Sequence, residues 1–225
     1  DYSLYNSILD DALYDDTFAE CFPLLQMTAQ LDSNGIARLI QSLKNGKAKV
    51  DLFRAITWGK IHESISDDDL STIISELEKF PEAKEVIYSI YQMRKHSRNG
   101  LLHYSTKYLE TSRAILEKTE FDLHLIEVDA QDEKIAMLID FSFVGPDAIA
   151  SAQRFSQNLA LAIAETKTFV FYHRSTLCSL AKVQPEIFLE SFLENVIFDS
   201  DALKSLVIDP FQTFSNPLNQ VTSDA

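Results

Sequence analysis

Turn residues and cysteines are scarce in this chain. It has 5 glycines and 6 prolines among 225 residues, too few for the many tight turns of an all-β protein. The two cysteines, Cys21 and Cys178, lie too far apart in the sequence to belong to a disulfide framework. These shortages exclude a turn-rich β-domain and a small disulfide-stapled domain, and we expect a protein of the reducing cytoplasm.

Long apolar segments are also missing. The longest run, around Leu159 to Ala164, is far shorter than the roughly 20 apolar residues that cross a membrane. No secretory signal is visible in the first residues, so we expect no membrane partner. The chain begins at Asp1 without an initiator methionine, and Ser223-Asp224 near its end has the character of a helix cap. From these two ends we expect a piece of a longer polypeptide.

Positive charge is scarce as well, with 20 Lys and Arg against 34 Asp and Glu and a net charge of −14. Acidic clusters such as Asp67-Asp68-Asp69 repel a phosphate backbone, so we do not expect a nucleic-acid partner. One basic cluster, Arg94-Lys95-His96-Ser97-Arg98, follows a predicted helix, where cations stabilise the negative end of the helix dipole. The alternative is a nucleic-acid-binding helical domain in which Arg94, Lys95 and Arg98 contact phosphates.

Motifs that carry chemistry are absent from the sequence. The glycines are isolated and form no phosphate-binding loop, and the histidines share no metal-ligand spacing with one another or with the cysteines. His173 and Cys178 resemble a base and a nucleophile, but an i, i+5 pair does not share one helical face. We therefore expect no cofactor, no metal and no enzyme. A hydrolase built on Cys178, His173 and a distant acid is the alternative.

What the sequence does contain is an apolar pattern that occurs twice between Ile36 and Met93, 34 positions apart. In its first half the residues follow i, i+3, i+4, i+7 spacing and in its second half i, i+1, i+4, and both spacings mark one face of an α-helix. In the first half of the pattern, Ile36, Leu39, Ile40 and Leu43 reappear as Leu70, Ile73, Ile74 and Leu77. In the second half, Leu52, Phe53 and Ile56 reappear as Val86, Ile87 and Ile90. The repeated unit is a helix, a turn and a second helix, and a period of this length is typical of a solenoid.

The spacing therefore predicts an all-α fold, a HEAT-like or tetratricopeptide-like stack of antiparallel helix pairs, although the small-residue positions of tetratricopeptide units are missing. An irregular helical domain with two similar hairpins is the alternative. We expect a repeat half over residues 1–120, a junction over 121–130, a second helical half over 131–208 and an extended tail over 209–225. Regularity fades after Gly100, which motivates the junction.

Three individual helices are predicted in detail. The first covers Leu4 to Tyr14 and buries Leu4, Ile8, Leu9 and Leu13. The second runs from Lys49 to Glu63, and the third from Leu101 to Lys118. Asn45-Gly46 predicts a helix end, and Ser66 and Pro81 predict helix starts.

Aromatic residues near the repeat provide candidate contacts to a partner. Tyrosine and tryptophan supply rigid contact area with a polar tip, which protein interfaces favour. The candidates are Trp58, Tyr88, Tyr91, Tyr104 and Tyr108. Packing between helices accounts for the same residues equally well, so both interpretations stay open at this point.

Three segments resemble a known group of proteins: Asp51 to Gly59, Ile87 to Arg94, and Gln184 to Leu189 with Asn216-Pro217-Leu218. Together they are similar to the C-terminal helical region of large bacterial proteins, some of which carry upstream nucleotide-binding or effector domains and are associated with phage defence. The resemblance implies a recognition or scaffold role and carries over no catalytic residue. We expect the partner to be another protein or an upstream domain of the same chain.

Overall fold

The computed structural model describes residues 2–29, 31–97, 103–121, 128–166 and 173–194. The described residues are helices and their connections, without a strand, so the predicted all-α class is confirmed. The chain divides into two compact units, Asp1–Thr111 and Ser112–Ala225. The boundary falls inside helix α7 (Thr106–Glu117), and each unit is described separately.

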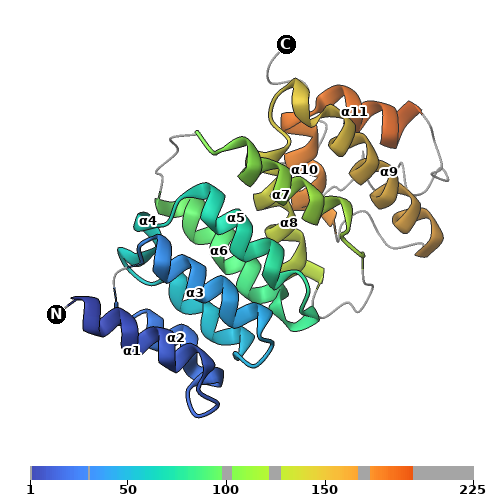
Figure 1. Ribbon diagram of the computed structural model, residues 1–225. Coiled ribbons are helices and arrows are strands. Elements are labelled where there is room, and N and C mark those ends of the chain that lie inside the picture. Colours follow the sequence, from blue (N-terminus) through green and yellow to red (C-terminus); the bar gives the residue numbers. More distant parts are fainter. Residues whose placement is uncertain (1, 30, 98–102, 122–127, 167–172, 195–225) are drawn as a thin grey trace. The chain divides into compact units, whose positions relative to one another are not determined.

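Unit 1 consists of helices arranged in two layers (Figure 1). One layer holds α1 (Tyr2–Tyr14), α3 (Ser33–Lys44) and α5 (Asp67–Leu77), with α3 contacting both α1 and α5. The other holds α2 (Phe22–Gln26), the 3₁₀ helix η2 (Val50–Thr57) and α6 (Lys84–Ser97), with η2 contacting both α2 and α6. Short helices join these elements: η1 (Ala19–Cys21), α4 (Ile61–Ser64) and η3 (Pro81–Ala83).

The repeated apolar pattern lies in the core of unit 1. Every one of its positions is buried or half-buried, and Leu39, Leu70, Phe53 and Ile90 are completely inaccessible. The helix caps repeat with the same period. The side chain of Asp32 accepts a hydrogen bond from Gly35 N (2.9 Å), and that of Ser66 accepts one from Asp69 N (3.1 Å).

The predicted helix ends of unit 1 are confirmed. Gly46 follows the last residues of α3 at φ 69°, and its N–H donates to the carbonyl of Leu43 (2.9 Å). A left-handed glycine with this bond is the usual C-terminal cap. Pro81 begins η3, which leads directly into α6, where its missing N–H costs nothing.

The predicted helix from Lys49 to Glu63 is wrong. The chain instead forms η2, turns at Gly59 (φ 48°) and then forms the short α4. The buried side chains of η2 include Val50, Phe53 and Ile56, which are three residues apart. That interval matches the three residues per turn of a 3₁₀ helix. The sequence prediction was based on Phe53 and Ile56 without Val50 and therefore did not recognise this interval.

The predicted inner face of the first helix is half wrong. In α1, Leu9 and Leu13 are buried, but Leu4 is 62% and Ile8 51% exposed. At 100° per residue, Leu4 and Ile8 lie on the side of α1 away from Leu9 and Leu13. Ala12, together with Leu13 and Phe22, completes the core cluster of this hairpin instead.

Unit 2 contains α8 (Val128–Ser142), α9 (Ile149–Thr166), α10 (Arg174–Val183) and α11 (Pro185–Leu189), which continues as a π-helical turn over Glu190–Glu194. α8 packs along α10, and α11 contacts α9 and α10. The largest fully buried side chains of this unit are phenylalanines. The rings of Phe143 and Phe155 lie 5.6 Å apart, and those of Phe188 and Phe192 5.4 Å apart.

Polar side chains close the helix ends of unit 2. Arg113 Nε donates to the carbonyl of Ser142 at the C-terminus of α8 (2.7 Å), a favourable site for a cation. Most of the predicted 121–130 junction, residues 195–208 of the predicted second helical half and the 209–225 tail lie outside the described residues. α7 begins at Thr106 rather than at Leu101, which also lies outside them.

Candidate functional site

A polar groove of about 680 Å³ lies between α1 and α3 of unit 1. The α1 side is formed by Ser3, Asn6, Ser7, Asp10, Leu13 and Tyr14. The α3 side is formed by Asn34, Ala37, Arg38 and Gln41. Hydroxyl and amide groups thus line most of it. We call it the α1–α3 groove.

Arg38 lies at the base of this groove, with 7% of its side chain exposed. Its Nε donates to the Asp10 carboxylate (2.6 Å), and its Nη2 donates to the carbonyl of Asn6 (3.3 Å). Asp10 itself is 61% exposed. The groove therefore holds one accessible carboxylate, oriented by one buried guanidinium.

Several groups in the groove are available to bind a ligand. Among the described residues, the side chains of Ser7 and Asn34 make no hydrogen bond. Gln41 Nε2 donates to Asn45 Oδ1 (2.8 Å), which leaves the Gln41 carbonyl oxygen as an acceptor. A smaller cleft of about 270 Å³ shares Leu13 and Tyr14 with the groove and is also lined by Asn45 and Lys47. Tyr14 is 70% exposed where the two meet.

Sequence reasoning did not identify this groove. The sequence contains one sign of a special position for Arg38: it is the first Lys or Arg of the chain, after 37 residues that contain neither. A second was the polar stripe of Asn34, Arg38, Gln41 and Asn45 on α3, which repeats at helical spacing opposite the apolar face. A polar stripe ordinarily marks a solvated surface, and only the position of α1 beside it makes a groove.

Trp58 is the predicted contact residue that lies most openly on the surface, at 56% exposed. It follows η2 in a hydrogen-bonded turn. Its N–H donates to Ala55 O (3.0 Å), and its carbonyl accepts from Ile61 N (3.2 Å). The turn holds the backbone of an exposed aromatic residue in place, which is a suitable arrangement for an interface anchor.

Because Trp58 is the single tryptophan, its fluorescence reports on this turn alone. We expect emission close to that of free N-acetyl-tryptophanamide and quenching by acrylamide to a similar degree. A steady-state quenching titration of the folded protein checks this, with the urea-unfolded protein as the reference. Strong protection from acrylamide in the folded protein would contradict the exposed position.

Three of the four candidate tyrosines are not surface residues. Tyr88, Tyr91 and Tyr108 are buried, and Tyr104 is half-buried. The rings of Tyr91 and Tyr108 lie 5.0 Å apart, and that of Tyr104 stacks on Tyr108 at 5.5 Å. Burial raises the pKa of Tyr88 to about 12 and the pKa of Tyr91 well above its ordinary value. For the buried three, core packing is the correct interpretation.

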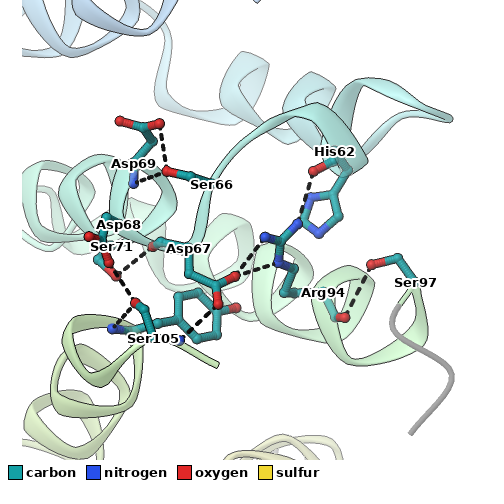
Figure 2. A network of polar contacts seen from close by, with 10 residues as sticks. His62, Ser66, Asp67, Asp68, Asp69, Ser71, Arg94, Ser97 and Ser105 are labelled. Atoms are coloured by element: carbon teal, nitrogen blue, oxygen red, sulfur yellow. Dashed lines mark hydrogen bonds and ion pairs between the residues drawn. The ribbon is translucent and has the colours of Figure 1, made fainter. Parts of the chain in front are cut away.

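The basic cluster does not present Arg94 to solvent, which argues against a phosphate contact at this residue. Arg94 is 4% exposed. Figure 2 shows its guanidinium directed at Asp67, and both Nε (2.8 Å) and Nη2 (2.6 Å) donate to one carboxylate oxygen. Nη1 donates to the carbonyl of His62 (3.2 Å). Lys95 is half-buried, and Arg98 lies outside the described residues.

The second oxygen of Asp67 connects this ion pair to α7. It accepts from Ser105 N (2.9 Å), and Ser105 Oγ donates to Asp68 (2.6 Å) and accepts from Tyr108 N (3.2 Å). Ser105 thus caps α7 while bonded to α5, as Figure 2 shows for its link to Asp68. The network ties three segments of unit 1 together and has a structural role.

His173 and Cys178 in unit 2 lie near one acid, Asp132. The Asp132 carboxylate accepts from Ser175 N (2.7 Å) and Thr176 N (2.9 Å) and so caps α10 from α8. Burial lowers the pKa of His173, whose ring lies edge-on to Phe121 at 5.6 Å. Burial also raises the pKa of the Cys178 thiol to about 11. A nucleophilic cysteine needs the opposite shift, so this arrangement favours a structural thiol.

Thiol alkylation tests that assignment. Burial raises the pKa of the Cys178 thiol to about 11, so little of it is present as the reactive thiolate at pH 7.5. The rate at which Cys178 is alkylated should therefore rise steeply as the pH rises above 9. Cys21 is exposed and serves as the internal control that reacts first. Peptide mass spectrometry after timed iodoacetamide treatment measures both sites. Faster alkylation of Cys178 than of Cys21 at pH 7.5 would contradict the structural assignment and support the hydrolase alternative.

Within the described part of the chain, no group of His, Cys, Asp or Glu side chains is arranged to hold a metal ion. None of the helices found there is both long and apolar enough to cross a membrane. No protein-family model, curated protein or solved structure matches this chain.

Proposed function

We propose that this chain is a recognition or scaffold region of a larger bacterial protein and that it binds a protein partner, or an upstream domain of its own chain, through unit 1. The α1–α3 groove is the observation that carries this proposal. It combines an accessible volume of about 680 Å³ with hydroxyl, amide and carboxylate groups, which suit recognition of another polypeptide.

The layered arrangement of unit 1 supports the same function. α1, α3 and α5 are neighbours in one layer, while α2, η2 and α6 are neighbours in the other. Helix pairs stacked in this way, as in HEAT-like and tetratricopeptide-like arrays, bind partners on the surface of one layer. The groove lies in the α1, α3, α5 layer, and Trp58 follows a helix of the other layer.

The burial of Arg94 argues against the nucleic-acid alternative, because its guanidinium is paired with Asp67 and cannot contact a phosphate without breaking that ion pair. The net charge of −14 also opposes binding to phosphates. The hydrolase alternative requires a reactive thiolate, whereas burial raises the pKa of Cys178. A non-catalytic function accounts for these features with fewer assumptions.

Site-specific photo-cross-linking in the bacterium that encodes the protein tests the proposal. Benzoylphenylalanine replaces Ser7 or Asn34 in the groove, or Gln92, an exposed residue of α6 that does not line it. We expect one protein, or the upstream domain, to cross-link from both groove positions and not from Gln92, with or without phage infection. The purified partner should then bind the purified chain.

Two results would overturn the proposal. Equal cross-linking from all three positions would show that the groove is not the binding surface. Recovery of nucleic acid with a steep salt dependence, and of no protein, would favour the nucleic-acid alternative.

A further inference from the structure

We infer that the α1–α3 groove takes an extended, positively charged peptide segment, whose cation binds Asp10 and whose backbone binds the polar side chains of α3. This inference rests on the proposed function and names the chemistry of its partner.

The lining of the groove excludes the other common form of peptide recognition. An amphipathic helix needs a hydrophobic groove for its apolar face. Here Ser7, Asn34 and Gln41 are polar, and Leu13, the one large aliphatic lining residue, is buried. An extended peptide instead carries unpaired N–H and C=O groups on its backbone. Hydroxyl and amide side chains both donate and accept, so they complement such a backbone.

The positions of the free groups fit this role. Asn34 and Ser7 make no side-chain hydrogen bond among the described residues, and they face the groove from α3 and α1 respectively. The Nη1 group of Arg38 likewise has no hydrogen bond within the described part of the chain. Arg38 can therefore donate to a peptide carbonyl while it continues to orient Asp10.

The charged residues of the groove indicate which charge its ligand carries. Arg38 is buried, whereas Asp10, its ion-pair partner, is 61% exposed and keeps its second oxygen available. The first 37 residues contain no Lys or Arg, and their acidic residues are Asp1, Asp10, Asp11, Asp15, Asp16, Glu20 and Asp32. Asp10 and Asp11 are the charged residues of α1 itself, so the α1 side of the groove favours a cation over an acidic segment.

The dimensions give the length of the segment. α1 has 13 residues, which span about 20 Å at 1.5 Å per residue. An extended chain covers that distance with about six residues at roughly 3.3 Å each. The smaller cleft, which shares Tyr14 with the groove, prolongs the path toward Asn45.

A random heptapeptide display library selected on the purified chain tests the inference. We expect the enriched peptides to be rich in Lys or Arg without helical apolar spacing. A synthetic peptide from the enriched set should bind the Asp10→Asn variant roughly fivefold more weakly, the effect of one accessible ion pair. Asp11→Asn is the matched control: it removes the same charge from an exposed residue of α1 outside the groove, and we expect less than a twofold change.

A second variant guards against a folding defect in Asp10→Asn, which leaves Arg38 without its counter-charge. Ser7→Arg changes an exposed residue and places a long cation in the groove. We expect it to leave the helical circular dichroism and the melting temperature unchanged and to weaken peptide binding at least tenfold. Unchanged binding by Ser7→Arg would overturn the groove as the binding site.

The remaining outcomes separate this inference from the proposed function. Enrichment of acidic peptides or of amphipathic-helix sequences would overturn the chemistry of the partner, while the cross-linking from Ser7 and Asn34 would still support recognition. Equal loss of binding in Asp10→Asn and Asp11→Asn would show a general charge effect and overturn the specific role of Asp10. Absence of any enriched peptide, with cross-linking intact, would overturn the extended-peptide mode.

Discussion

Replacing Arg94 by methionine is expected to lower the free energy of unfolding of unit 1 by about 3–5 kcal/mol. The variant removes the guanidinium but leaves the Asp67 carboxylate buried, 6% exposed, without its counter-charge. It also deprives the carbonyl of His62 of a hydrogen bond. Urea denaturation measures the loss, and hydrogen exchange of α5, α6 and the start of α7 shows where it acts.

Arg154→Met is the matched control for this prediction. Arg154 makes a similar two-bond ion pair with Glu117 (3.0 and 2.7 Å), but its side chain is 56% exposed. Exposed pairs contribute little because water solvates both charges when the pair is broken. We expect Arg154→Met to differ little from the natural protein. Equal effects of the two variants would show that the Asp67–Arg94 pair is not buried in solution.

Replacing Gln26 by methionine is expected to raise the free energy of unfolding by about 2 kcal/mol. Gln26 lies in α2, is completely inaccessible, and neither atom of its amide has a hydrogen-bond partner among the described residues. Burying unpaired polar atoms is costly. Methionine has nearly the same length and fills the same space without polar atoms.

Gln92→Met on α6 is the control for that change, because Gln92 is exposed and glutamine and methionine have similar helix propensities. It should leave the stability unchanged. Both variants are measured by urea denaturation under one set of conditions. A Gln26→Met protein less stable than the natural one would show that the buried amide is hydrogen-bonded in solution, for example through a water molecule.

Local signals in the sequence predicted the all-α class and several helix ends correctly. Ile36, Leu70 and their repeats at helical spacing face the inside as expected, because the period of 3.6 residues belongs to the chain itself. Ser66 and Gly46 mark helix ends through bonds to residues three positions away. Such short-range interactions depend little on the rest of the fold.

The errors arose where two patterns were compatible with the same residues. Val50, Phe53 and Ile56 suit a 3₁₀ helix, but Phe53 and Ile56 also fit the α-helical repeat. Leu4 and Ile8 have the spacing of a buried face and are nevertheless exposed. Apolar side chains on a surface are common, so spacing alone did not reveal which side of α1 faces the core.

By itself, the sequence determined that this protein is built of helices, where several of them begin and end, and that its net charge is strongly negative. Tertiary structure decided which polar residues are buried and which remain accessible. Arg38 is buried against Asp10, 28 positions away, and Arg94 against Asp67, 27 positions away. The physical reason is that burial depends on neighbours contributed by distant segments. The same packing places α1 beside the polar stripe of α3 and thereby creates the groove.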